Sequence, residues 1–178
     1  MLSEAANGWK SSFFKGASTV ASGMQEIQKP TTLWHYTVKN ALRQILAEGL
    51  IRPASPGLPK GQKGVVWFSA AGDWDPSANR WWRSPEGIAK QLGKDQTIVL
   101  GAGLARIGVS PQVANVDWNA YKEQSGVPTK VARALYDAAI KAGSRPRLWY
   151  ATFASVPRSQ WLAVEVWDDE LGWVAQRF

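Results

Sequence analysis

The stretch Leu33-Trp34-His35-Tyr36-Thr37 decides the fold that we predict, and it carries the only histidine of the chain. Aromatic and β-branched residues fill these positions, which is typical of a β-strand. Strand alternation places Leu33, His35 and Thr37 on one face, and Trp34 and Tyr36 on the other. An imidazole on such a strand could line a cleft or could be a half-buried structural histidine. The sequence leaves both interpretations open.

A helix is predicted directly after this strand. Leu42, Ile45 and Leu46 follow at helical spacing, and Gly49 stands where a glycine commonly ends a helix. Residues 54–64 then form a long loop with three glycines and two prolines. The next strand is expected at residues 64–69, which form a short apolar run bounded by a glycine.

Composition limits the kinds of chemistry that the chain can carry. Its 178 residues, 45% of them hydrophobic, suit one domain with a real core, which we place at residues 31–178 after an N-terminal arm of residues 1–30. Cysteine is absent and histidine occurs once, so thiolate chemistry and histidine-rich metal centres are disfavoured. No apolar run is long enough to span a membrane and residues 1–30 do not resemble a signal peptide, so we expect a cytoplasmic protein.

The net charge is +7, and residues 33–110 hold ten Lys and Arg against five Asp and Glu. A basic surface favours anionic partners such as dinucleotides, RNA or DNA, although surplus cations can also serve solubility alone. Residues 70–83 interleave charges with tryptophans. Asp75 and Pro76 predict the start of a short helix. Trp81 and Trp82 either stack on a base or nicotinamide ring, or cover the sheet from a surface helix.

The remaining chain predicts a mixed α+β fold. Strands are expected at residues 97–100, 104–109, 148–154, 161–167 and 173–176, and helices at 117–124 and 128–142. The second helix carries an apolar stripe formed by Val131, Leu135, Ala138 and Ala139. In the strand 161–167, alternation places Glu165 on one face with Trp161 and Trp167. Glu165 is therefore expected to line a cleft, the alternative being a strand-edge carboxylate in water.

The order of these elements resembles the ADP-ribosyltransferase superfamily, on Leu33–Thr37, the following helix, Glu48–Ile51 and Val65–Ser69. The resemblance is to its histidine-bearing branch, which includes diphtheria-toxin-like enzymes, DNA ADP-ribosyltransferase toxins and tRNA 2′-phosphotransferases. It covers roughly residues 32–70, with Glu165 as a late match. The chain departs from the branch in lacking a tyrosine motif after Ser69, for which Trp74, Trp81 and Trp82 could substitute. It also lacks the paired histidines of the phosphotransferases.

This resemblance implies a single ADP-ribosyltransferase-like domain with a split antiparallel β-core flanked by helices, which binds NAD as its substrate. His35 would bind a ribose hydroxyl, and Glu165 would contact the nicotinamide ribose. The residues expected at the site are Glu165 and His35 for catalysis, and His35, Tyr36, Thr37, Trp67, Ser69 and Arg106 for NAD binding. The chemistry fits this set, because cleavage of the glycosidic bond of NAD develops oxocarbenium character that a carboxylate can stabilise without a metal. A donor beside Glu165 is required, and Arg106 or a backbone amide is the candidate.

The preferred function is transfer of ADP-ribose from NAD to a macromolecular acceptor, or hydrolysis of NAD. The alternative is a non-catalytic binding module that uses its basic, Trp-rich face to bind nucleic acid or a protein. A third interpretation is a partner protein whose tryptophans form an interface. If His35 and Glu165 face one cleft, the enzyme is favoured; if they lie on opposite sides of the sheet, the binding module is favoured.

Overall fold

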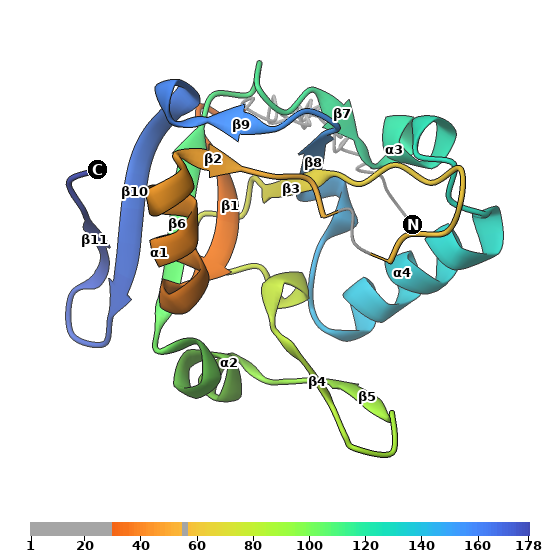
Figure 1. The fold of residues 1–178 in the computed structure, drawn as a ribbon, viewed down its shortest axis with the longest axis horizontal. Coiled ribbons are helices and arrows are strands. Elements are labelled where there is room, and N and C mark those ends of the chain that lie inside the picture. The colour runs from red at the N-terminus through yellow and green to blue at the C-terminus, as the bar shows by residue number, and fades with distance from the viewer. Residues whose placement is uncertain (1–29, 55–56) are drawn as a thin grey trace, which may run out of the picture.

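One antiparallel sheet forms the centre of the computed structural model, which describes residues 30–54 and 57–178 (Figure 1). The order of its seven strands in this part of the chain is β11-β10-β6-β1-β3-β8-β7. Their bounds are β1 Leu33–Val38, β3 Val66–Ser69, β6 Leu104–Val109, β7 Val116–Asp117, β8 Trp149–Thr152, β10 Trp161–Asp168 and β11 Gly172–Ala175. The predicted arm of residues 1–30 lies, apart from Pro30, outside the described residues.

Four helices accompany the sheet in the described chain: α1 Lys39–Glu48, α2 Lys94–Gly101, α3 Trp118–Gln124 and α4 Thr129–Lys141. Two small ribbons complete the regular structure. They pair β2 Leu50–Ile51 with β9 Val156–Pro157, and β4 Trp81–Arg83 with β5 Ala89–Gln91. Short 3₁₀ turns lie at Pro76–Ala78, Pro146–Leu148 and Arg158–Gln160. The predicted α+β class is therefore confirmed. None of the helices in the described chain is long and apolar enough to cross a membrane.

The two faces of β1 bury different parts of the core. Facing residues of an antiparallel pair point to the same side, and β1 pairs along its whole length with β6. Leu33 and His35 therefore share a face with Val109 and Ile107. This first face packs under α1 through Leu42. The opposite, second face carries Trp34 and Tyr36, and α3 and α4 cover its β3–β8 half around a second cluster formed by Val65, Val116, Trp118, Tyr121, Ala132 and Ala151.

The boundary between β1 and β3 is weakly paired. In the described chain these strands are in register only at Trp34 and Ser69, whereas β1 and β6 are in register at every residue of β1. Beyond Trp34 the two strands are joined by a side chain, because His35 bonds to the main chain of β3 at Trp67. This boundary is where the candidate site lies.

Several predicted elements are confirmed. Helix α1 ends at Gly49, which is left-handed with φ 65° and donates its N–H to Ile45. Asp75 caps the turn that begins at Pro76 by accepting from the N–H of Ser77. The expected helices near residues 117–124 and 128–142 are α3 and α4, and the strands predicted at 64–69, 104–109, 148–154, 161–167 and 173–176 are β3, β6, β8, β10 and β11.

Two predicted elements are wrong. The expected strand at residues 97–100 is part of helix α2. A four-residue apolar run does not distinguish a strand from a helix, and the decisive feature lies upstream, where Gln96 accepts from the N–H of Gly93 at the helix start. The surface helix at Trp81 and Trp82 is instead strand β4, and both indoles are exposed.

Strand β10 contains a bulge that corrects the predicted faces of residues 161–167. Trp161 pairs with Val109 and Ala163 with the next residue, Gly108, so Leu162 is the extra residue. Trp161 is therefore turned into the core under α1, while Leu162 is 58% exposed. Trp167 lies beyond the bulge and stays on the face of Glu165, but the expected pair of flanking indoles is reduced to one.

Candidate functional site

A cavity of about 410 Å³ opens beside the β1–β3 boundary, and aromatic rings make much of its wall. Trp67, Trp118, Tyr121 and Trp149 line it from the second face of the sheet and pack against one another. From the other side come Leu135 and Ala138 of α4 and Trp81 of β4. Such a cavity suits a planar aromatic ligand.

Helix α4 presents its apolar stripe to this cavity more than to the core. Leu135 is 46% exposed, whereas Ala132 and Ala139 are buried. Leu135, Ala138 and Ala139 all line the cavity. The predicted stripe exists, but three of its four residues border an open space.

His35 lies at the cavity wall on the first face of the sheet. Its Nδ1 is 3.0 Å from the carbonyl oxygen of Trp67, and because that oxygen only accepts, Nδ1 carries the proton. The ring also packs edge-on against Phe68. Burial lowers the pKa of His35, against the opposing effect of its bond to Trp67, so the ring is neutral near pH 7. Thr37 shares this face and does not line the cavity.

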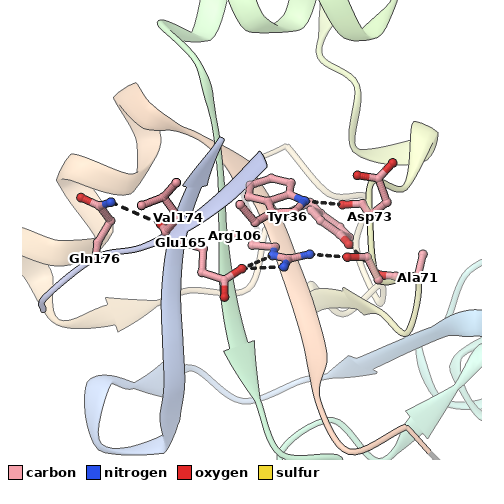
Figure 2. Close-up of polar contacts among 9 residues, drawn as sticks. Tyr36, Ala71, Asp73, Arg106, Glu165, Val174 and Gln176 are labelled. Atoms are coloured by element: carbon pink, nitrogen blue, oxygen red, sulfur yellow. Dashed lines mark hydrogen bonds and ion pairs between the residues drawn. The ribbon is translucent and has the colours of Figure 1, made fainter. Parts of the chain in front are cut away.

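Tyr36 and Arg106 are neighbours on the second face, where both bind the main chain of the loop that follows β3. The Tyr36 hydroxyl donates to the carbonyl oxygen of Ala71, and Nη1 of Arg106 donates to that of Gly72. Figure 2 shows the guanidinium of Arg106 between this loop and Glu165. Burial raises the pKa of Tyr36 to about 12, so the phenol stays protonated.

Glu165 forms a nearly buried ion pair with Arg106. Its Oε2 lies 2.6 Å from Nε and 2.5 Å from Nη2 of Arg106, and the two side chains are only 18% and 9% exposed. The guanidinium carbon also lies 3.8 Å from the ring centre of Trp34 and 4.4 Å from that of Trp173. The prediction that Arg106 supplies the donor for Glu165 is confirmed. Neither residue lines the cavity.

Ser69 faces the cavity, and its hydroxyl is committed to Asp75. It donates to Oδ2 at 2.7 Å, where Nε1 of Trp149 also donates at 2.8 Å. The other oxygen, Oδ1, accepts from the N–H and hydroxyl of Ser77 and from the hydroxyl of Ser144. Burial alone would raise the pKa of Asp75, but these hydrogen bonds outweigh it and hold that pKa below its usual value. Asp75 thus ties β3, β8 and the chain after α4 into one wall.

The structure gathers most of the expected site residues but does not bring His35 and Glu165 together. Glu165 pairs with Arg106, which pairs with Tyr36, so these three share the second face with Trp67 and Ser69. His35 pairs with Ile107 and points to the first face. Opposite faces are the arrangement expected for the non-catalytic alternative.

Sequence reasoning missed part of the cavity wall. The sequence identifies Asp75 only as a helix cap, and it does not distinguish Trp118, Tyr121 and Trp149 from other aromatic residues. These aromatic residues lie on separate elements that follow β3 in the chain. No fixed sequence spacing connects them, so the sequence does not reveal that they form one wall. In the described chain, no group of three or more His, Asp or Glu side chains could hold a metal ion.

In comparisons with known proteins, no family model, no curated protein and no solved structure matched this chain.

Proposed function

We propose that the protein binds NAD in the aromatic cavity and cleaves its nicotinamide glycosidic bond, passing ADP-ribose to a macromolecular acceptor or to water. The observation that carries the proposal is the cavity itself. It is lined by His35, Tyr36, Trp67 and Ser69, four of the residues expected to bind NAD. Its aromatic walls suit the stacking of a nicotinamide or adenine ring.

In this proposal Glu165 is the catalytic carboxylate, and His35 acts at the wall of the cavity. Glu165 lies two strands from β1, with Arg106 between it and Tyr36. Glu165 does not line the cavity, so the proposal requires the ribose to extend from the cavity past Tyr36 and Arg106 before the carboxylate can stabilise its oxocarbenium character as nicotinamide leaves. The neutral His35 has its Nε2 available as an acceptor for a ribose hydroxyl, because Nδ1 is bound to Trp67.

A second candidate is a nucleotide-binding module without catalysis. It is favoured by the opposite faces of His35 and Glu165, and by the absence of Glu165 from the cavity wall. Both candidates place the ligand in the same cavity, so both predict that NAD binds there. Only the enzyme predicts that bound NAD is cleaved.

The test combines binding and turnover in one set of proteins. NAD and ADP-ribose are titrated against the full chain with indole fluorescence as the signal, and nicotinamide release is measured in parallel. The variant Ala138→Trp places an indole in the cavity from exposed α4, and Ala134→Trp puts the same bulk on that helix away from the cavity.

We expect Ala138→Trp to weaken binding at least about tenfold, since the ligand and the indole compete for one space, and Ala134→Trp to leave it unchanged. Binding with nicotinamide release supports the enzyme. Binding without release supports the module. Failure of the wild type to bind NAD or ADP-ribose overturns the NAD proposal.

A further inference from the structure

The hairpin formed by β4 and β5 projects from the body of the fold (Figure 1). Two indoles of this hairpin are exposed. Trp81 is 62% exposed and Trp82 is 46% exposed. Trp82 faces Lys90 across the hairpin, and Arg83 faces Ala89. Because facing residues share a side, Trp82 and Lys90 lie on one side of the ribbon, and Trp81 and Arg83 lie on the other.

The cations of this hairpin are not neutralised by carboxylates. Arg80, Arg83 and Lys90 are all exposed, and none of them forms an ion pair with another described residue. The single acidic residue of the hairpin, Glu86, lies in its turn. Each exposed indole is therefore accompanied by positive charge that is free to meet an external anion.

We propose that the β4–β5 hairpin is a docking surface for single-stranded nucleic acid. Unpaired bases stack on exposed aromatic rings while neighbouring cations contact the phosphates, and this surface offers both. A duplex hides the faces of its bases, so it would use the cations alone. Protein interfaces are also enriched in Trp and Arg but depleted in Lys, so it is Lys90, exposed beside Trp82, that favours a polyanion over a protein partner.

The hairpin also borders the aromatic cavity, since Trp81 and Gln91 line it. Trp81 and Gln91 face each other, so they lie on the side of the ribbon opposite to Trp82 and Lys90. A strand docked on Trp82 and Lys90 is therefore separate from the cavity, and its docking does not require NAD. The residues chosen for the test, Trp82 and Lys90, lie outside the cavity wall, so NAD binding can be measured independently.

The experiment measures the anisotropy of a fluorescently labelled, mixed-sequence DNA oligonucleotide, single-stranded or annealed to its complement, as the full chain is added at several salt concentrations. The variants are Trp82→Ala, Trp82→Phe and Lys90→Gln. Lys122→Gln on α3 is the matched charge control, because Lys122 is also exposed and has no ion pair in the described chain.

We expect Trp82→Ala to weaken single-strand binding about tenfold, which is within the range for loss of one stacked base, and Trp82→Phe to retain most of it. Lys90→Gln should reduce the slope of log affinity against log salt by about 0.7, and Lys122→Gln should not change it.

Equal affinity of all hairpin variants, equal or tighter binding of the duplex, or no binding of either DNA overturns the proposal. If hairpin-dependent binding is found while NAD fails to bind, the proposed function falls and this inference stands. If NAD is turned over but the hairpin variants bind DNA like the wild type, the proposed function stands and this inference falls.

Discussion

Replacement of Asp75 by asparagine tests whether one buried carboxylate holds the cavity wall together. Asp75 is 3% exposed, and its two oxygens accept from five donors. Asparagine keeps the shape and turns one oxygen into an NH₂ group. The hydroxyls of Ser69, Ser77 and Ser144 can rotate to accept from that group. The indole N–H of Trp149 and the main-chain N–H of Ser77 cannot, because both only donate.

These two fixed donors approach different oxygens of Asp75, Oδ2 for Trp149 and Oδ1 for Ser77. The N–H of Ser77 has a second acceptor, the hydroxyl oxygen of Ser144 at 2.8 Å, whereas the indole N–H of Trp149 donates to Asp75. We therefore expect the asparagine amide to turn its oxygen to Trp149 and its NH₂ toward Ser77, so that both fixed donors keep an acceptor. The hydrogen bonds to this side chain still lose the contribution of the charge, which roughly halves their strength. We expect Asp75→Asn to lower the free energy of unfolding by about 1–3 kcal/mol.

Urea denaturation followed by circular dichroism measures this loss. Asp137→Asn is the control, because Asp137 is paired with Arg133 on an exposed helix face and the pair contributes at most about 0.5 kcal/mol. A change of less than about 0.5 kcal/mol for Asp75→Asn would refute the account of five convergent donors.

Three further outcomes are expected. Glu165→Gln should lower the rate of nicotinamide release about 100-fold or more with little change in NAD affinity, and full activity would remove Glu165 from the catalytic role. Stability should fall as the pH drops below about 6.5, by up to about 1.4 kcal/mol per pH unit, because the unfolded chain then binds a proton that the buried His35 does not. His35→Gln should flatten this dependence in urea titrations between about pH 5 and pH 7, and an unchanged slope would contradict it. Gly101→Ala should cost about 1–3 kcal/mol in thermal unfolding, since its Cβ would lie 2.4 Å from Cβ of Val38, and Val38→Ala should restore part of this if the clash is the cause.

The parts of the fold that could be predicted are those that depend only on residues close together in the sequence. The strand around His35 and the end of α1 at Gly49 depend on alternation and on one glycine, and both are confirmed. The run at residues 97–100 looks like a strand by itself, because its helical start is set by Gly93 and Gln96, outside the run. Leu162 could not be recognised as a bulge, since only pairing with β6 reveals the extra residue.

The sequence predicts which residues contribute to the candidate site, but it does not predict how they are arranged in space. The partnership of Arg106 with Glu165 followed from the need of a shielded carboxylate for a cation, and it is present. The direction of His35 relative to Glu165 depends on two consecutive strand registers, which the sequence does not state. The cavity wall on α4 was also hidden, because an apolar stripe looks the same whether it meets a core or an empty space.

The single register pair between β1 and β3 has a mechanical consequence. The sheet consists of two hydrogen-bonded blocks, β11-β10-β6-β1 and β3-β8-β7, and few backbone bonds resist a change of angle between them. The imidazole of His35 connects the two blocks across their boundary, the hinge, because its Nδ1 bonds to the main chain of Trp67 in β3. The cavity has walls on both blocks, so a ligand that fills it would stiffen the hinge, and amide hydrogen exchange would slow in both blocks together.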